Sequence, residues 1–254
     1  MSSYKIYKKT ISVNSSKFLF KHLLSICNFY KPNTFKSFKI YKNLWNDESF
    51  TKKMIGLRKN KKLFSSIYDT MQLSNELYSI AYKNNFNSIA SKFLSVPASN
   101  LMLRSVQFRM DFPDDSRNSY GWHQDNAYDK YNLLSKNGVV LWIPLVDTNV
   151  NNGTLIIKPG SENSTFKCSK KVFSGNKYKS EQILVMKKYL KKYKSKSINV
   201  KKNNCLTTFC GLFHKSGVNT SNHIRFTIIA RLNNMLSKDF LFYRRITKKK
   251  QNNI

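Results

Sequence analysis

The apolar run GVVLWIPLV occupies residues 138–146 of this 254-residue chain. Its length and its β-branched and aromatic residues predict a strand. Further strand-like runs bounded by turn residues lie on both sides of it, at 101–110, 153–158, 204–213 and 224–232. The segments Asp111 to Arg117 and Asn149 to Gly153 carry turn chemistry. We therefore expect a mainly β core.

Helical patterns precede the strands. Residues 18–27 place apolar side chains at three- and four-residue steps, which predicts a short amphipathic helix. Residues 61–94 show the same spacing without Gly or Pro, and they too should be helical. The expected division is a helical segment at 1–99 that packs on the core, the β core at 100–235, and a basic tail at 236–254.

A Lys-rich segment at 167–202 interrupts the core and contains Glu181 as its only acidic residue. Such a composition is typical of a solvated surface. We predict that the segment is an excursion from the sheet, partly helical between Gln182 and Tyr193.

The net charge of +32 comes from 45 Lys and Arg against 13 Asp and Glu. Only 8 of the basic residues are Arg, while 37 are Lys and 29 residues are Asn. Lys and Asn are what an AT-rich genome encodes, whereas proteins that read phosphates and bases usually draw on Arg. We attribute most of the charge to codon bias on a solvated surface. A polyanionic partner, either nucleic acid or an anionic surface, stays open as the alternative.

Several protein classes are excluded by what the sequence lacks. No stretch approaches the ~18 apolar residues of a membrane-spanning helix. The four Cys have no CxxC spacing, so we expect neither a zinc ribbon nor a disulfide framework, but a reducing compartment and a cytoplasmic protein. Residues 1–46 lack acidic residues, as transit peptides do, but they also lack Arg, so we expect them in the mature protein.

The motif His123-Gln124-Asp125 is the first sign of chemistry, in a chain with only four His and nine Asp. In a strand, residues i and i+2 point to the same face, so this imidazole and this carboxylate could converge on one ion. The bland alternative is a turn with one capping Asp and one surface His.

A second histidine, His214, precedes Arg225 by eleven residues. Two His and one carboxylate form the facial triad of non-haem Fe(II) oxygenases, and a fixed Arg suits the distal carboxylate of 2-oxoglutarate. His223 is the rival third ligand. It lies two residues from Arg225, so on one strand the cation would crowd the metal, and we choose His214.

In chain order, further motifs surround these residues: Arg109 to Pro113, Trp122 to Asp125, Leu141 to Leu145, Asn152 to Leu155, Pro159 to Ser161, His214 to Asn219, Ser221 and Arg225. Over about half of its length the chain thereby resembles the phytanoyl-CoA dioxygenase family of Fe(II)/2-oxoglutarate-dependent oxygenases. One departure is visible, because Glu162 stands where the family usually has a His after Pro-Gly-Ser.

The resemblance implies a double-stranded β-helix, the cupin-like jelly roll, with flanking helices. It implies that His123, Asp125 and His214 bind Fe(II) and are catalytic, and that Arg225 and Ser216 hold 2-oxoglutarate. The expected reaction uses O2 to hydroxylate a small-molecule or acyl substrate and releases succinate and CO2. The carboxylate at 125 favours hydroxylation, since related halogenases have a small residue there.

Two alternatives stay open at this point. Arg109 could face the substrate or pair with a nearby carboxylate such as Asp111. The rival function is a non-enzymatic basic protein that binds nucleic acid or an anionic surface.

Overall fold

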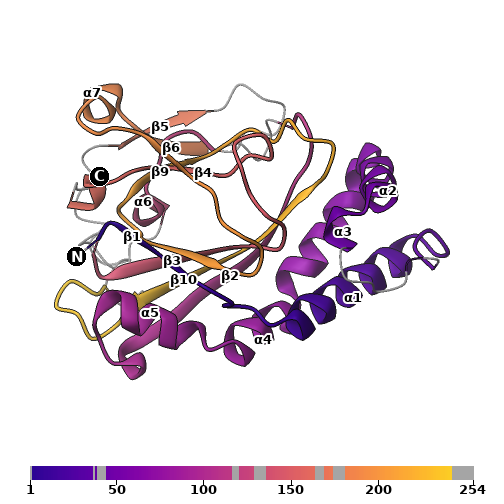
Figure 1. The fold of residues 1–254 in the computed structure, drawn as a ribbon, viewed down its shortest axis with the longest axis horizontal. Coiled ribbons are helices and arrows are strands. Elements are labelled where there is room, and N and C mark those ends of the chain that lie inside the picture. The colour runs from indigo at the N-terminus through magenta and orange to yellow at the C-terminus, as the bar shows by residue number, and fades with distance from the viewer. Residues whose placement is uncertain are drawn as a thin grey trace, which may run out of the picture.

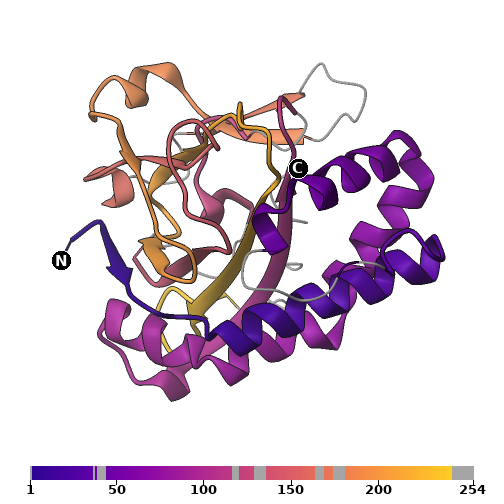
Figure 2. The same cartoon turned by 45° about the vertical axis from the view of Figure 1, so that its right-hand side comes forward.

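The computed structural model describes residues 2–36, 38, 44–115, 120–128, 136–163, 169–173 and 181–241. Within this part of the chain, two antiparallel sheets face each other and a layer of helices covers the outer face of the larger sheet (Figure 1). The turned view shows the same helical layer wrapping around one side of the sheets (Figure 2).

The larger sheet has five strands, in the order β1 (Tyr4–Tyr7), β8 (Cys205–Phe209), β3 (Gly138–Pro144), β10 (Arg225–Asn234) and β2 (Leu101–Asp111). The smaller sheet has the order β7 (Lys196–Ile198), β4 (Leu155–Lys158) and β9 (Phe213–Ser216). A buried apolar cluster that includes Trp142, Ile157 and Ile229 joins the two sheets. This is the predicted jelly-roll core with flanking helices.

Five longer helices form the outer layer: α1 (Val13–Tyr30), α2 (Glu48–Lys59), α3 (Lys61–Leu73), α4 (Asn75–Lys83) and α5 (Phe86–Leu94). The helix predicted at 18–27 is the middle of α1. The continuous helical stretch predicted at 61–94 is three helices. Ser74 accounts for the first break, because its hydroxyl accepts a hydrogen bond from Leu77 N and so caps α4, and left-handed Asn85 ends the next.

The side chains of β10 alternate between two environments. Phe226, Ile228 and Ala230 belong to the apolar core shared with the helices. Because successive residues of a strand point to opposite faces, Arg225 and Arg231 face the interior between the two sheets. The strand therefore supplies both the apolar contact with the helices and the cations of the interior.

Two strand predictions need correction. The segment at 1–99 is not all helical, because Tyr4–Tyr7 pairs with β8 at the edge of the large sheet. The run at 204–213 is two strands that belong to different sheets, β8 and β9, joined by a turn at 210–212. An apolar run cannot reveal such a turn, since Leu212 is buried like its strand neighbours. The division into three segments at residues 99 and 235 stays a prediction.

The Lys-rich segment differs from its prediction as well. It contains the hairpin β5 (Ser169–Phe173) and β6 (Glu181–Val185), and only a four-residue helix, α7 (Lys187–Leu190), follows. Strand β6 is not a solvated excursion, because Val185 N donates to Trp122 O and Ile183 N donates to the Tyr128 hydroxyl. The hairpin therefore packs on the segment that carries His123-Gln124-Asp125. The predicted tail lies outside the described residues beyond 241.

In the described part of the chain, no helix has both the length and the hydropathy needed to cross a bilayer.

Gly153 tests how closely the loop before β4 approaches the loop after β9, within the smaller sheet. Its φ is +79°, and an added Cβ would lie 2.7 Å from Gly217 O. Gly153→Ala should lower the free energy of unfolding by about 1–3 kcal/mol, because the backbone of Ala is strained at this φ and the added Cβ displaces the neighbouring loop. Urea denaturation measures the change. Gly56→Ala in α2 is the matched control, since its Cβ meets open space. Ala is the better helix former, so this change should raise the free energy of unfolding by about 1 kcal/mol. Equal effects of both variants would contradict the packing argument.

Candidate metal centre

His123 and His214 are held next to each other by an isolated pair of backbone hydrogen bonds. His123 N donates to His214 O over 2.9 Å, and His214 N donates to His123 O over 3.1 Å. The two residues are thus directly opposite, with their rings on one side and 4.1 Å between centroids. Residues that are 91 positions apart in sequence therefore present a pair of imidazoles.

Backbone carbonyls fix the orientation of both rings. His123 Nδ1 lies 2.8 Å from Gly121 O, and His214 Nδ1 lies 2.9 Å from Leu212 O. A carbonyl only accepts, so each Nδ1 carries the proton and each Nε2 keeps a free lone pair. Such an outer hydrogen bond is the usual support of a metal-binding His.

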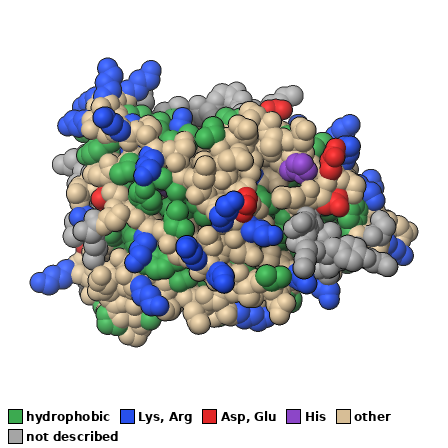
Figure 3. All heavy atoms as spheres, viewed as in Figure 1, with side chains coloured by type: hydrophobic (Ala, Val, Ile, Leu, Met, Phe, Trp, Pro, Cys, Tyr) green, Lys and Arg blue, Asp and Glu red, His purple; other side chains and the backbone are tan. Residues whose placement is uncertain are grey.

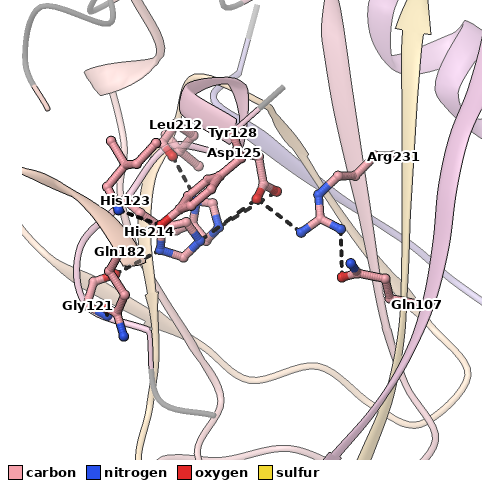
Figure 4. A network of polar contacts seen from close by, with 10 residues as sticks. Gln107, Gly121, His123, Asp125, Tyr128, Gln182, Leu212, His214 and Arg231 are labelled. Carbon is pink, nitrogen blue, oxygen red and sulfur yellow. Dashed lines mark hydrogen bonds and ion pairs between the residues drawn. The ribbon is translucent and has the colours of Figure 1, made fainter. Parts of the chain in front are cut away.

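Asp125 offers a third possible ligand atom from the first residue of the short helix α6 (Asp125–Tyr128), not from a strand as predicted. Its carboxylate lies 3.8 Å from His123 Nε2 and 3.9 Å from His214 Nε2. The ligand atoms of the three residues lie within 4.8 Å of one another (Figure 4). All three side chains are buried.

Asp125 Oδ2 is buried and, among the described residues, accepts no hydrogen bond. A buried carboxylate oxygen left in this state costs about 1–3 kcal/mol or more. A metal ion coordinated by Oδ2 and the two Nε2 atoms would remove that cost. The donor set of two His and one carboxylate therefore fits a divalent transition metal and leaves positions open for other ligands.

The electrostatics keep His123 and Asp125 in the protonation states that bind a cation. Burial lowers the pKa of His123 to about 3, and neighbouring His214 acts in the same direction, so His123 is neutral at pH 7. Burial alone would raise the pKa of Asp125, but Arg231 and the two His outweigh it, and the net shift is downward. Asp125 is thus ionised at pH 7.

Arg231 holds the other oxygen of this carboxylate. Its Nη2 lies 3.1 Å from Asp125 Oδ1, and its Nη1 donates to Gln107 Oε1 over 2.9 Å (Figure 4). The guanidinium fixes the carboxylate with Oδ1 3.8 Å from His123 Nε2 and Oδ2 3.9 Å from His214 Nε2. The sequence did not indicate this contact, because Arg231 and Asp125 are 106 residues apart.

Arg225 lies at the opposite end of β10 and is almost fully buried. Its Nη2 is 3.0 Å from Asp111 Oδ2, and Arg109 Nη2 is 2.7 Å from Asp111 Oδ1. Two guanidinium groups thus share one carboxylate. Among the described residues, Arg225 Nε is buried without a hydrogen-bond partner. Burial lowers the pKa of Arg225, and Arg109 adds to the effect while Asp111 opposes it. The pair predicted for Arg109 and Asp111 is therefore present, and the excess positive charge suits an anion.

The remaining predicted residues have clear positions. Ser216 ends β9, two residues after His214, so both side chains point to the same face. His223 lies in the loop before β10 and is not part of the cluster. His22 sits on α1, 3.6 Å from Glu76. Glu162 is buried and accepts a hydrogen bond from the Ser3 hydroxyl.

A cavity of about 380 Å³ opens beside His123 and Asp125. Its other described lining residues come mainly from β2 and α3, with Tyr120, Tyr128 and Arg231. Arg109 lines it as well, so this residue both pairs with Asp111 and faces the cavity. Strand alternation from Arg109 would have indicated Gln107 and Ser105, but the sequence gives no signal for Tyr68 or Gln72 on α3.

Solved structures share this fold at low sequence identity. The apo form of the non-heme monooxygenase ThoJ matches with a TM-score of 0.57 and 15% identity, over 92% of this chain and 75% of that one. SnoN, a non-heme alpha ketoglutarate dependent epimerase from nogalamycin biosynthesis, matches with a TM-score of 0.55 and 11% identity, over 92% and 77%. AviO1 from Streptomyces viridochromogenes Tue57 matches with a TM-score of 0.51 and 12% identity, over 94% and 93%.

Sequence comparison is informative at the level of the family. No curated protein is similar enough in sequence to count as a match. The family model described as Phytanoyl-CoA dioxygenase (PhyH) matches residues 24–227, a range that contains every predicted ligand. The chain therefore belongs to the phytanoyl-CoA dioxygenase family, as its motifs and its jelly-roll fold led us to expect.

Proposed function

We propose that this protein is an Fe(II)- and 2-oxoglutarate-dependent dioxygenase that hydroxylates a small-molecule substrate and releases succinate and CO2. The observation that carries the proposal is the buried cluster of His123, Asp125 and His214, whose ligand atoms lie within 4.8 Å of one another. Fe(II), when bound, supplies the oxidation chemistry that couples O2 and 2-oxoglutarate to the substrate. The chain supplies the three ligands and the cavity beside them.

The electrostatics of Arg225 support binding of the cosubstrate. Among the described residues, the buried Nε–H of Arg225 has no hydrogen-bond acceptor. Arg225 also shares the single carboxylate of Asp111 with Arg109, so an added carboxylate would balance the two guanidinium charges. A planar guanidinium binds a carboxylate through two parallel hydrogen bonds. In this proposal, Arg225 and the Ser216 hydroxyl hold the distal carboxylate of 2-oxoglutarate, whose keto acid end reaches the metal.

The similar solved structures support iron and 2-oxoglutarate as cofactors, but they do not point to one type of reaction. SnoN has been solved in complex with Fe3+, alpha ketoglutarate and nogalamycin RO, and it is described as an epimerase. Hydroxylation is therefore our proposal for this chain, based on its intact carboxylate ligand Asp125.

The rival function, a basic protein without catalysis, depends on the charge alone. On the face in Figure 3, Lys and Arg side chains are scattered rather than gathered in one stripe. Arginine shows a different distribution: Arg104, Arg109, Arg225 and Arg231 are four of the five Arg in the described part of the chain, and all are at the cavity or the adjoining ion pairs. The residue best suited to anions is thus concentrated at the candidate site, which favours the enzyme.

The first prediction concerns metal and cosubstrate. Protein prepared without oxygen should bind one Fe(II) and then 2-oxoglutarate, with a weak visible charge-transfer band, because a bidentate 2-oxo acid needs two open metal positions. Anaerobic absorption titration measures both. If the two ligands together give neither a band nor a mutual gain in affinity, the enzyme proposal is wrong.

The second prediction separates two histidines. His214→Ala should abolish iron-dependent succinate formation, because it removes a ligand atom from the metal. His223→Ala is the matched control and should retain most activity, because His223 lies in the loop before β10 and is not part of the cluster. The opposite ranking of the two variants would mean that the ligand set is misassigned.

The third prediction concerns the cosubstrate anchor. Arg225→Leu should leave Fe(II) binding nearly intact and weaken 2-oxoglutarate binding by about 100-fold or more, because a buried carboxylate loses its charged partner. Arg225→Lys should restore only part of the affinity, since it lacks the bidentate fork. Calorimetry with Fe(II)-loaded protein measures the affinity, and circular dichroism checks that each variant is folded. Unchanged 2-oxoglutarate affinity in the Leu variant would rule out Arg225 as the anchor, and Arg231 would be tested next.

A further inference from the structure

The cavity beside the metal ligands has an unusual lining. Among its described residues are three guanidinium groups, from Arg104, Arg109 and Arg231, and a single carboxylate, Asp125, which is also a candidate metal ligand. The uncharged lining residues, apart from His123, carry hydroxyl or amide groups: Tyr68, Gln72, Ser105, Gln107, Tyr120 and Tyr128. No aliphatic side chain is among the described residues of the lining. A fatty-acyl chain would find tyrosine rings but no aliphatic side chain to pack on among these residues, so the lining favours a more polar ligand.

A local irregularity of β2 directs Arg104 into this cavity. Along the pairing with β10, Arg231 is opposite Ser105 and Leu232 is opposite Leu103, so the register shifts and residue 104 is the extra residue of a β-bulge in β2. Such a β-bulge re-aims side chains, and bulges are over-represented next to active sites. In a regular strand, neighbours 104 and 105 would face opposite sides, whereas here both line the cavity.

Arg104 and the proposed 2-oxoglutarate anchor are at opposite ends of the same strand pair. Arg225 pairs across the strands with Asp111. Six residues further along β10, Arg231 pairs with Ser105, the neighbour of Arg104. At about 3.3 Å per residue, the two ends are roughly 20 Å apart. The five-carbon chain of 2-oxoglutarate is much shorter, so it cannot occupy both ends. A ligand that contacts Arg104 would therefore be a different molecule from a 2-oxoglutarate held by Arg225.

Arg109 and Arg231 are each engaged by a carboxylate, from Asp111 and Asp125. A guanidinium has five N–H donors, so one carboxylate partner does not by itself prevent it from contacting a ligand as well. The cavity volume of about 380 Å³ is at the small end of the range of ligand sites. We propose that the substrate is a small, polar, hydroxyl-bearing molecule with a carboxylate or phosphate group, and that Arg104 binds this anionic group.

The inference deepens the proposed function, because it names the substrate class of the same site. It is tested first by binding, which does not depend on turnover. The full-length chain, without metal and then with Fe(II) and 2-oxoglutarate under anaerobic conditions, is titrated by calorimetry with four probes: D-glucose 6-phosphate, D-gluconate, D-glucose and octanoate. The first two separate phosphate from carboxylate, the third removes the charge, and the fourth keeps the charge on an apolar chain.

We expect one or both polar anions to bind about tenfold or more tightly than glucose and octanoate, with the tighter of the two identifying the anionic group. Arg104→Gln should remove most of this preference and leave 2-oxoglutarate affinity within about twofold. Arg104→Lys should restore part of it. Lys21→Gln, which removes one charge from the exposed face of α1, is the matched control and should change nothing.

Three results would overturn the inference: glucose or octanoate binding as well as the polar anions, anion binding that is unchanged in Arg104→Gln, or a parallel loss of 2-oxoglutarate affinity in that variant. The last result would assign Arg104 to the cosubstrate. The two proposals can fail separately. If Arg104→Gln loses anion binding as expected but the parent protein forms no Fe(II)/2-oxoglutarate band, the substrate site stands and the oxygenase proposal fails. Succinate release that rises with the bound anion and not with glucose would support both the substrate site and the oxygenase proposal.

Discussion

The reciprocal hydrogen bonds between the backbones of His123 and His214 are the contact on which the site depends. They connect a loop that leaves β2 to a strand of the smaller sheet, 91 residues away in sequence. Because the pair is directly opposite, the two imidazoles lie together, and the carbonyls of Gly121 and Leu212 then fix their tautomers. Asp125, two residues after His123 and the first residue of α6, is the third member of the set.

Burying charge between the sheets imposes the second constraint. A lone carboxylate in the interior would be neutralised or strongly destabilising, so each one has cationic partners. Asp125 has Arg231 and the two imidazoles, and Asp111 has Arg109 and Arg225. Neither set is saturated, because Asp125 Oδ2 and Arg225 Nε lack hydrogen bonds among the described residues. The protein thus keeps one free acceptor where a metal fits and one free donor where an anion fits.

The helical layer and the β6 hairpin support this interior from two sides. Gln72 of α3 pairs through its side-chain amide with both backbone groups of Phe108, which satisfies part of the edge of β2. On the other side, β6 donates to Trp122 O and to the Tyr128 hydroxyl. These contacts hold β2 and the His123 segment, and with them the Arg-rich wall of the cavity.

The sequence by itself determined four strands of the core, the metal-ligand motif and the family, because each depends on local patterning or on residue types at fixed spacing. Apolar runs predicted β2, β3, β4 and β10, and the His-x-Asp motif with a later His and Arg predicted the centre and its anchor. It also left open whether Arg109 faces a substrate or a carboxylate, and the structure places it at the cavity and beside Asp111.

Only the tertiary structure decided which distant side chains meet. The Arg231–Asp125 contact spans 106 residues, and the bulge that turns Arg104 inward exists only in the pairing of β2 with β10. The Lys-rich hairpin was misjudged for the same reason, since its composition reports solvation while its hydrogen bonds to the His123 segment depend on a partner far away in sequence. Local pattern fixes which residue types a strand presents, whereas register and long-range pairing fix what they face.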